Sequence, residues 1–201
     1  MPNRATSLFS AGPLALIGLI AAVALTRLLP HPPNFSPAAA MALFGGAYLA
    51  KRSWAVLVPL IALFISDLAL GLMMGGEYFQ YFVSAGFVLV YLTIAVLSVF
   101  GFGLRGKVSV ARVAGYGIAG SALFFLVTNF GVWFGSVYYP QTASGLMAAY
   151  AAGIPFLQNG ILGTLFYSAV LFGSYEILKQ RIPALARIFV ALVRAPPRST
   201  P

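Results

Sequence analysis

The stretch of residues 31–50, HPPNFSPAAAMALFGGAYLA, constrains the fold of this chain more than any other. Three prolines, Pro32, Pro33 and Pro37, exclude a helix interior over the first part of this stretch. Ser36 and Pro37 are typical of a helix start, because serine accepts from free first-turn amides and proline fits the first helical position. The apolar run ends at Lys51 and Arg52. The predicted helix, 37–50, is about 21 Å long, whereas a bilayer core is about 30 Å thick.

A helix this short leaves a hollow in a membrane protein. If Lys51 and Arg52 lie at one surface, the helix starts about 9 Å below the other surface. Irregular backbone at that depth is tolerated only where it is packed in protein or lines a wet cavity. We therefore expect a proline-rich re-entrant dip before a short second helix, and a pocket that opens to one side above the positive end of that helix.

The composition agrees with a membrane protein, because 61% of the residues are hydrophobic and 7% are charged, against about a quarter charged in soluble domains. The apolar runs are continuous over about 20 residues, which favours helices over the alternating strands of a barrel. We predict an all-α, polytopic six-helix transmembrane bundle in a single domain, 1–178, followed by a basic and partly amphipathic cytoplasmic tail, 179–201, on the membrane surface. The predicted spans are residues 12–29, 37–50, 53–74, 79–103, 113–135 and 154–178. For the first span a cleaved signal peptide is the alternative, because Ala22-Val23-Ala24 resembles a cleavage site, although the apolar run continues to Leu29.

The basic residues predict the orientation. With a cytoplasmic N-terminus, six alternating spans place all but one of the 12 Lys and Arg residues inside, and Arg27 toward the outside. We therefore expect a multi-pass protein of the bacterial cytoplasmic (inner) membrane with both termini inside. We interpret the net charge of +9 as a topology signal and a contact for anionic membrane lipid rather than a nucleic-acid surface. The inner set is Arg4, Lys51, Arg52, Arg105, Lys107, Arg112, Lys179, Arg181, Arg187, Arg194 and Arg198.

Polar residues gather in the predicted outer half, whereas the inner half offers little beyond Ser and Thr. A conducting path would need polar groups through the full thickness, so this asymmetry indicates a pocket open to the outside. Residues 34–36 would form its floor, where helix-terminal amides favour an anionic or acceptor-rich group. Asp67 would bind a ligand donor or hold the Asn34 segment, amide side chains would orient the ligand, and Trp133 and Tyr138 would form apolar walls. The candidate substrate-binding residues are His31, Asn34, Phe35, Ser36, Asp67, Asn129, Trp133, Tyr138, Gln158 and Asn159.

Each of these assignments has a structural alternative. Asp67 would pair with Arg27 or with groups near Glu77. His31, the single histidine, would hydrogen-bond at the rim rather than bind a metal. The amide side chains would join helices. The loop 136–153 is either a lid, with a short helix in its second half, or a surface loop anchored by interfacial tyrosines.

Small residues repeat every four positions on the short helix, at Ala38, Ala42 and Gly46. Small residues at this spacing let helices approach closely. The stripe therefore serves either packing inside the bundle or docking onto a partner subunit.

Catalytic motifs are missing from the sequence. It has no cysteine, one histidine and three acidic residues, and it contains no phosphate-binding loop, HExxH or GxSxG. We therefore expect no catalytic residues, no metal and no cofactor.

The run PPNFSPAAAMALFGGAYL, followed by PLIALFISDLALG, resembles an uncharacterised bacterial family of transport proteins, with PNFSP and LFGGAY as its motif. That family is similar in size, span number and layout to the S components of energy-coupling factor (ECF) vitamin transporters, and the likeness spans about residues 12–178. It implies a six-helix bundle that binds a vitamin or similar molecule at its outer end. It also implies a transmembrane coupling subunit and ATPases as partners. S components usually carry the docking motif on their first helix, whereas the stripe at Ala38, Ala42 and Gly46 lies on the second predicted helix.

The sequence therefore predicts an S-component-like protein that binds a small organic solute for uptake. Two alternatives stay open. One is an intramembrane enzyme that uses Asp67 and His31 as acid and base. The other is a structural or assembly subunit, which would have a packed outer half without a cavity.

Overall fold

The computed structural model describes residues 11–181, and these form helices and connections without a strand. The all-α class is therefore confirmed for this part of the chain. Arg4 and the tail beyond residue 181, for which we predicted an amphipathic surface segment, lie outside the described residues. In chain order the elements are α1 (Ala11–Leu25), the 3₁₀ turn η1 (Thr26–Leu28), α2 (Ala38–Tyr48), α3 (Arg52–Met74), α4 (Gly76–Phe82), α5 (Ala85–Phe100), the 3₁₀ turn η2 (Gly101–Leu104), α6 (Val110–Phe134) and α7 (Ala143–Arg181).

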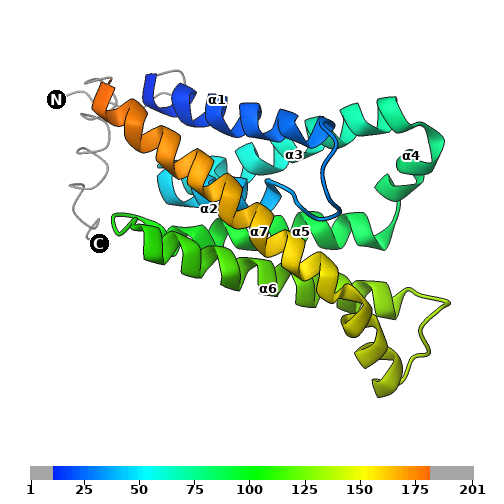
Figure 1. Cartoon of the computed structure of the whole chain (residues 1–201). Helices are drawn as coiled ribbons and strands as arrows, with labels where there is room; N and C mark the ends of the chain where they lie inside the picture. Colours follow the sequence, from blue (N-terminus) through cyan, green and yellow to red (C-terminus); the bar gives the residue numbers. More distant parts are fainter. Residues whose placement is uncertain (1–10, 182–201) are drawn as a thin grey trace, which may run out of the picture.

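The short helix α2 is the centre of the molecule. It has 11 residues, and all of them are buried, so it is only about 16 Å long. It packs against α1, α3, α5, α6 and α7, and Figure 1 shows it enclosed by the longer helices. A helix that is surrounded by protein has no face turned to water, which is why α2 is apolar all round.

Four helical segments of the described chain are long and apolar enough to cross a membrane. They are α3, α5 continued by η2, α6 and α7, whereas α1 and α2 are shorter apolar helices. The prediction of a membrane protein is thereby supported at the level of length and composition.

The boundaries differ from the predicted ones at two places. The predicted span 79–103 is broken, because α4 ends at Phe82 and Ser84 caps a new helix by accepting from the amide of Phe87 at 3.1 Å. The predicted loop 136–153 is mostly helical, because α7 begins at Ala143, well before the predicted start at 154. Figure 1 shows that the first turns of α7 run in a different direction from the rest of the helix, and the bend lies near Pro155.

The small-residue stripe is used inside the chain. Ala38, Ala42 and Gly46 are all buried, and a Cβ at Gly46 would lie within 3.0 Å of the backbone of Gly101. Such an approach needs glycine on both helices. The docking assignment for these three residues is therefore wrong for this structure, because α5 and η2 already occupy the face that a partner would need.

Basic side chains gather at the end of the bundle where α2 finishes. Arg105 donates to the carbonyl oxygens of Gly46 and Leu49 at 2.8 and 2.9 Å, and it lies over the ring of Phe102. Arg52 lies over the same ring. Arg105 thus satisfies the free carbonyls at the C-terminal end of α2, where a positive charge is favourable.

Candidate functional site

A cavity of about 740 Å³ lies at the opposite end of the bundle, where α2 begins. Its lining includes Ala38 and Ala39, the first two residues of α2. The exposed side chains of Leu29, Met73 and Met74 also line it and mark its mouth. The remaining wall comes from η1, the connection that follows it, α3, α4, α5, α6 and α7. The cavity therefore exists because α2 is too short to fill the space between these elements.

The connection between η1 and α2 is held against α7. Asn34 has a φ of 62°, a left-handed conformation that asparagine adopts more readily than most residues. The backbone of Phe35 and Ser36 lies so close to α7 that a Cβ at Gly163 would come within 3.0 Å of it. The side-chain amide of Asn159 donates to the carbonyl of Pro33 at 3.0 Å. The segment is therefore packed on protein on one side and borders the cavity on the other.

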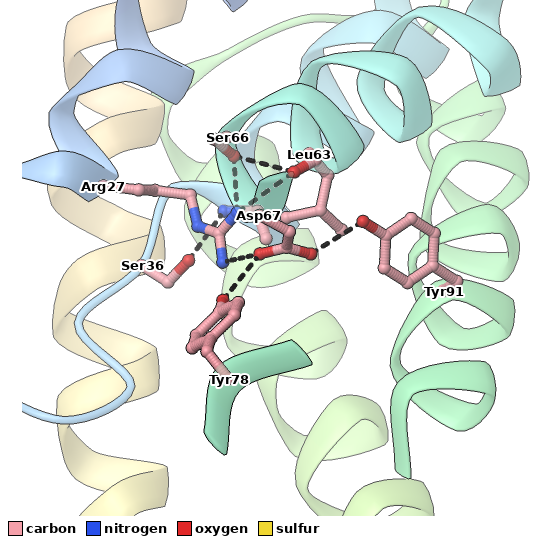
Figure 2. Close-up of polar contacts among 8 residues, drawn as sticks. Arg27, Ser36, Leu63, Ser66, Asp67, Tyr78 and Tyr91 are labelled. Atoms are coloured by element: carbon pink, nitrogen blue, oxygen red, sulfur yellow. Dashed lines mark hydrogen bonds and ion pairs between the residues drawn. The ribbon is translucent and has the colours of Figure 1, made fainter. Parts of the chain in front are cut away.

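A buried ion pair joins η1 and α3 at the cavity wall (Figure 2). Nη2 of Arg27 lies 2.5 Å from Oδ1 of Asp67, and only 2% of Asp67 is exposed. Tyr78 donates to Oδ1 at 3.0 Å and Tyr91 donates to Oδ2 at 2.7 Å. The carboxylate therefore accepts from η1, α4 and α5, which fixes three elements around α3.

The guanidinium of Arg27 is equally well satisfied. Its Nη1 donates to Ser66 Oγ at 2.5 Å and to the carbonyl of Leu63 at 3.2 Å. Burial, followed by the neighbouring Asp67 carboxylate, raises the pKa of Tyr78 to about 12, so this phenol stays protonated and donates at neutral pH. The structural alternative for Asp67, pairing with Arg27, is the arrangement that the structure shows.

Half of the predicted site residues lie at the cavity, on three segments: the connection between η1 and α2, the helix α3 and the helix α6. They are His31, Asn34, Ser36, Asp67 and Asn129.

The other predicted site residues lie elsewhere. Phe35 is half-buried and packs against Phe166 and Tyr167, with ring centroids 5.7 and 5.8 Å from its own. Trp133 donates to the carbonyl of Pro140 at 2.9 Å and so anchors the α6–α7 connection, and Tyr138 is 89% exposed. These two side chains do not form the predicted walls.

The two amides of α7 also fall outside the cavity lining. Asn159 holds Pro33 instead, and Gln158 is exposed. Asn159 therefore acts on the cavity by fixing its rim, which matches the structural alternative for the amides better than direct binding.

Aromatic walls come from residues that the sequence did not single out. Tyr78, Tyr81, Phe124, Phe125 and Phe156 line the cavity. Phe125 lies one turn before Asn129, and the amide of Asn129 donates to its carbonyl at 2.9 Å. The polar residue Asn129, one turn away, was thus the one sequence signal that could have pointed to Phe125 as a cavity residue. Tyr78 and Tyr81 gave no such signal, because they lie on α4, which was not predicted to be a separate helix from α5.

The chemistry of the wall is mostly apolar with separate polar groups. Ser121 donates to Thr164 at 3.0 Å and thereby joins α6 to α7. Ser36 Oγ accepts from the amide of Ala38 at 3.3 Å, as the predicted helix start requires. Among the described residues no group of three His, Cys, Asp or Glu side chains could hold a metal ion. The arrangement suits reversible binding of an organic molecule.

A family of unknown function, DUF6580, matches residues 8–185, which is most of the chain. No curated protein and no solved structure matches the chain.

Proposed function

The chain belongs to DUF6580, a family of unknown function, and we propose that it binds a small organic solute at the outer face of the bacterial inner membrane for uptake. In this proposal α1, α2, α3, α5, α6 and α7 form a six-helix bundle with both termini in the cytoplasm. The helix α4 covers part of the outer end.

The observation that carries the proposal is the cavity itself. Its volume of about 740 Å³ falls within the range of about 300–1,000 Å³ that is usual for small-molecule sites. Apolar and aromatic side chains dominate its wall, and a few polar groups converge on it, which is the usual chemistry of such sites.

The charges support the orientation. Arg52 and Arg105 lie together over Phe102 at the end where α2 finishes, whereas the cavity lies where α2 begins. Because basic residues favour the cytoplasmic side, the cavity faces outward. A solute would then enter from the periplasmic or extracellular side.

The resemblance to S components adds partners to the proposal. A coupling subunit and ATPases of the ECF type would drive release of the solute to the inside. The buried stripe of α2 is not available to them, so they would contact lipid-facing helices or the basic end of the bundle.

The two alternative functions fit the site less well. As acid and base, Asp67 and His31 would need free protonatable atoms facing a common substrate. Both oxygens of Asp67 already accept hydrogen bonds, and His31 Nδ1 lies 3.0 Å from the carbonyl of Pro32. A structural subunit would not need a cavity at its outer end.

Filling the cavity tests the proposal. Gly160 lines the cavity, and a Cβ there would meet only the Asn34 carbonyl, at 3.9 Å. The Cβ of Gly160→Leu therefore fits without a backbone clash, and the rest of the side chain adds volume at the cavity wall. Gly173 lies on the same helix with nothing within 4 Å of its Cβ position and does not line the cavity. Gly173→Leu is therefore the matched control.

The measurement is mass spectrometry of small molecules that stay bound to protein purified in lipid nanodiscs from its expression host. We expect wild type and Gly173→Leu to retain the same small molecule and Gly160→Leu to lose it. Retention by all three proteins, or by none, would contradict binding in this cavity.

A further inference from the structure

We infer that the cavity selects electrically neutral solutes, because the two buried charges on its wall cancel each other and are locked together. This inference rests on the proposed function and assigns a substrate class to the same site. It makes Arg27 and Asp67 specificity-determining residues that act without needing to bond the ligand.

The first step of the argument is the charge count. Among the described residues that line the cavity, Arg27 and Asp67 are the only Lys, Arg, Asp or Glu side chains. They form one ion pair, so the wall carries no net charge from them.

The second step is that neither charge is free to turn toward a ligand. The Asp67 carboxylate accepts from Arg27, Tyr78 and Tyr91, and Figure 2 shows these donors approaching it from separate elements. The Arg27 guanidinium is also bonded to Leu63 and Ser66. A charged ligand would have to break several of these bonds to gain a counter-charge.

The third step is the chemistry of the remaining wall. Its polar groups, among them Asn34, Tyr81 and Asn129, are neutral donors and acceptors. An ion moved from water into such surroundings loses its hydration without a paired charge, whereas a neutral amide or hydroxyl group can replace its water hydrogen bonds one for one.

The start of α2 adds a preference for an acceptor atom. Its amides carry a partial positive charge, and Ala38 and Ala39 line the cavity. The amide of Ala38 is already bonded to Ser36 Oγ, so the remaining potential suits a carbonyl or hydroxyl oxygen. The inferred substrate is an apolar body with neutral hydrogen-bonding groups, at least one of which is an acceptor.

The test uses three probes that share an indole body: indoleacetamide, which is neutral, indoleacetate, which is an anion, and tryptamine, which is a cation. Each is titrated against the thermal unfolding of the full chain in nanodiscs, at about pH 8. The proteins are wild type, Asp67→Asn, Arg27→Gln and the double variant. Ligands that bind the folded state raise its unfolding temperature.

We expect wild type to bind indoleacetamide on the order of tenfold more tightly than either charged probe. In Asp67→Asn the unpaired Arg27 should move the preference toward indoleacetate, and in Arg27→Gln the unpaired Asp67 should move it toward tryptamine. The double variant, which again carries no charge, should return to the amide. If a single variant does not fold, the inference is tested by whether wild type and the double variant both bind indoleacetamide more tightly than the charged probes.

Tighter binding of either charged probe to wild type would overturn the inference and leave the proposed function standing, as would an order of affinities that is the same in all four proteins. If no probe stabilises any of the proteins, the proposed function itself is contradicted along with the inference.

Discussion

At the scale of single residues, the Arg27–Asp67 pair is the most consequential contact. Asp67→Asn leaves the buried guanidinium without its counter-charge, and removing one partner of such a pair typically lowers the free energy of unfolding by about 3–5 kcal/mol. We expect a loss of this size in chemical denaturation of the purified protein.

The double variant Arg27→Gln/Asp67→Asn is the control for this prediction. It removes both charges, so it should be more stable than either single variant. Additive losses would show that the two side chains act independently and that the pair seen in the structure does not form.

The sequence located these residues only in part. The polar residues in apolar spans were recognisable because such residues are rare there, and Asp67, Asn34 and Asn129 do line the cavity. Phe124 and Phe156 were not recognisable, because an apolar side chain in a span looks the same whether it faces lipid, core or cavity. Trp133 does not form the predicted cavity wall, because a position near the rim does not determine which way a side chain points. Its indole N–H donates to the carbonyl oxygen of Pro140 instead.

At the scale of elements, the contact of α2 with α5 and η2 depends on glycine. A Cβ at Gly46 would lie so close to the carbonyl oxygen of Ser98 that the backbone must shift. We expect Gly46→Ala to lower the free energy of unfolding by about 1–3 kcal/mol, the usual range for overpacking, measured by chemical denaturation.

Gly18 on α1 gives the matched substitution, because nothing lies within 4 Å of its Cβ position. Gly18→Ala should leave stability unchanged or raise it by up to about 1 kcal/mol through helix propensity. Equal effects at the two sites would mean that α2 and α5 are not packed as closely as the structure has them.

The short helix was predicted correctly because residues next to each of its ends mark where it begins and ends. Ser36 and Pro37 mark its start and Lys51 and Arg52 follow its end, and the structure has α2 at Ala38–Tyr48. A short helix in the second half of the loop 136–153 was one of two alternatives, but its continuity with the last span, as α7 from Ala143, was not predicted. Its first turns contain small and polar residues that suit a loop equally well, and Pro155 bends the helix without ending it.

At the scale of the whole molecule, the proposed orientation can be measured because the chain contains no cysteine. Each introduced cysteine is then the sole thiol. Tyr138→Cys at the α6–α7 connection should react with a membrane-impermeant maleimide on intact cells, since this position is 89% exposed. Lys107→Cys at the opposite end should react only after the cells are permeabilised. The reverse pattern would place the cavity on the cytoplasmic side.

The most direct measurement of binding is a crystal structure of the protein purified from its expression host with no ligand added. We expect density for a compact small molecule in the cavity, between the start of α2 at Ala38 and the wall at Phe156. A cavity closed by its own side chains, or one filled by a lipid chain that enters from the bilayer, would contradict the proposal that this bundle binds a solute.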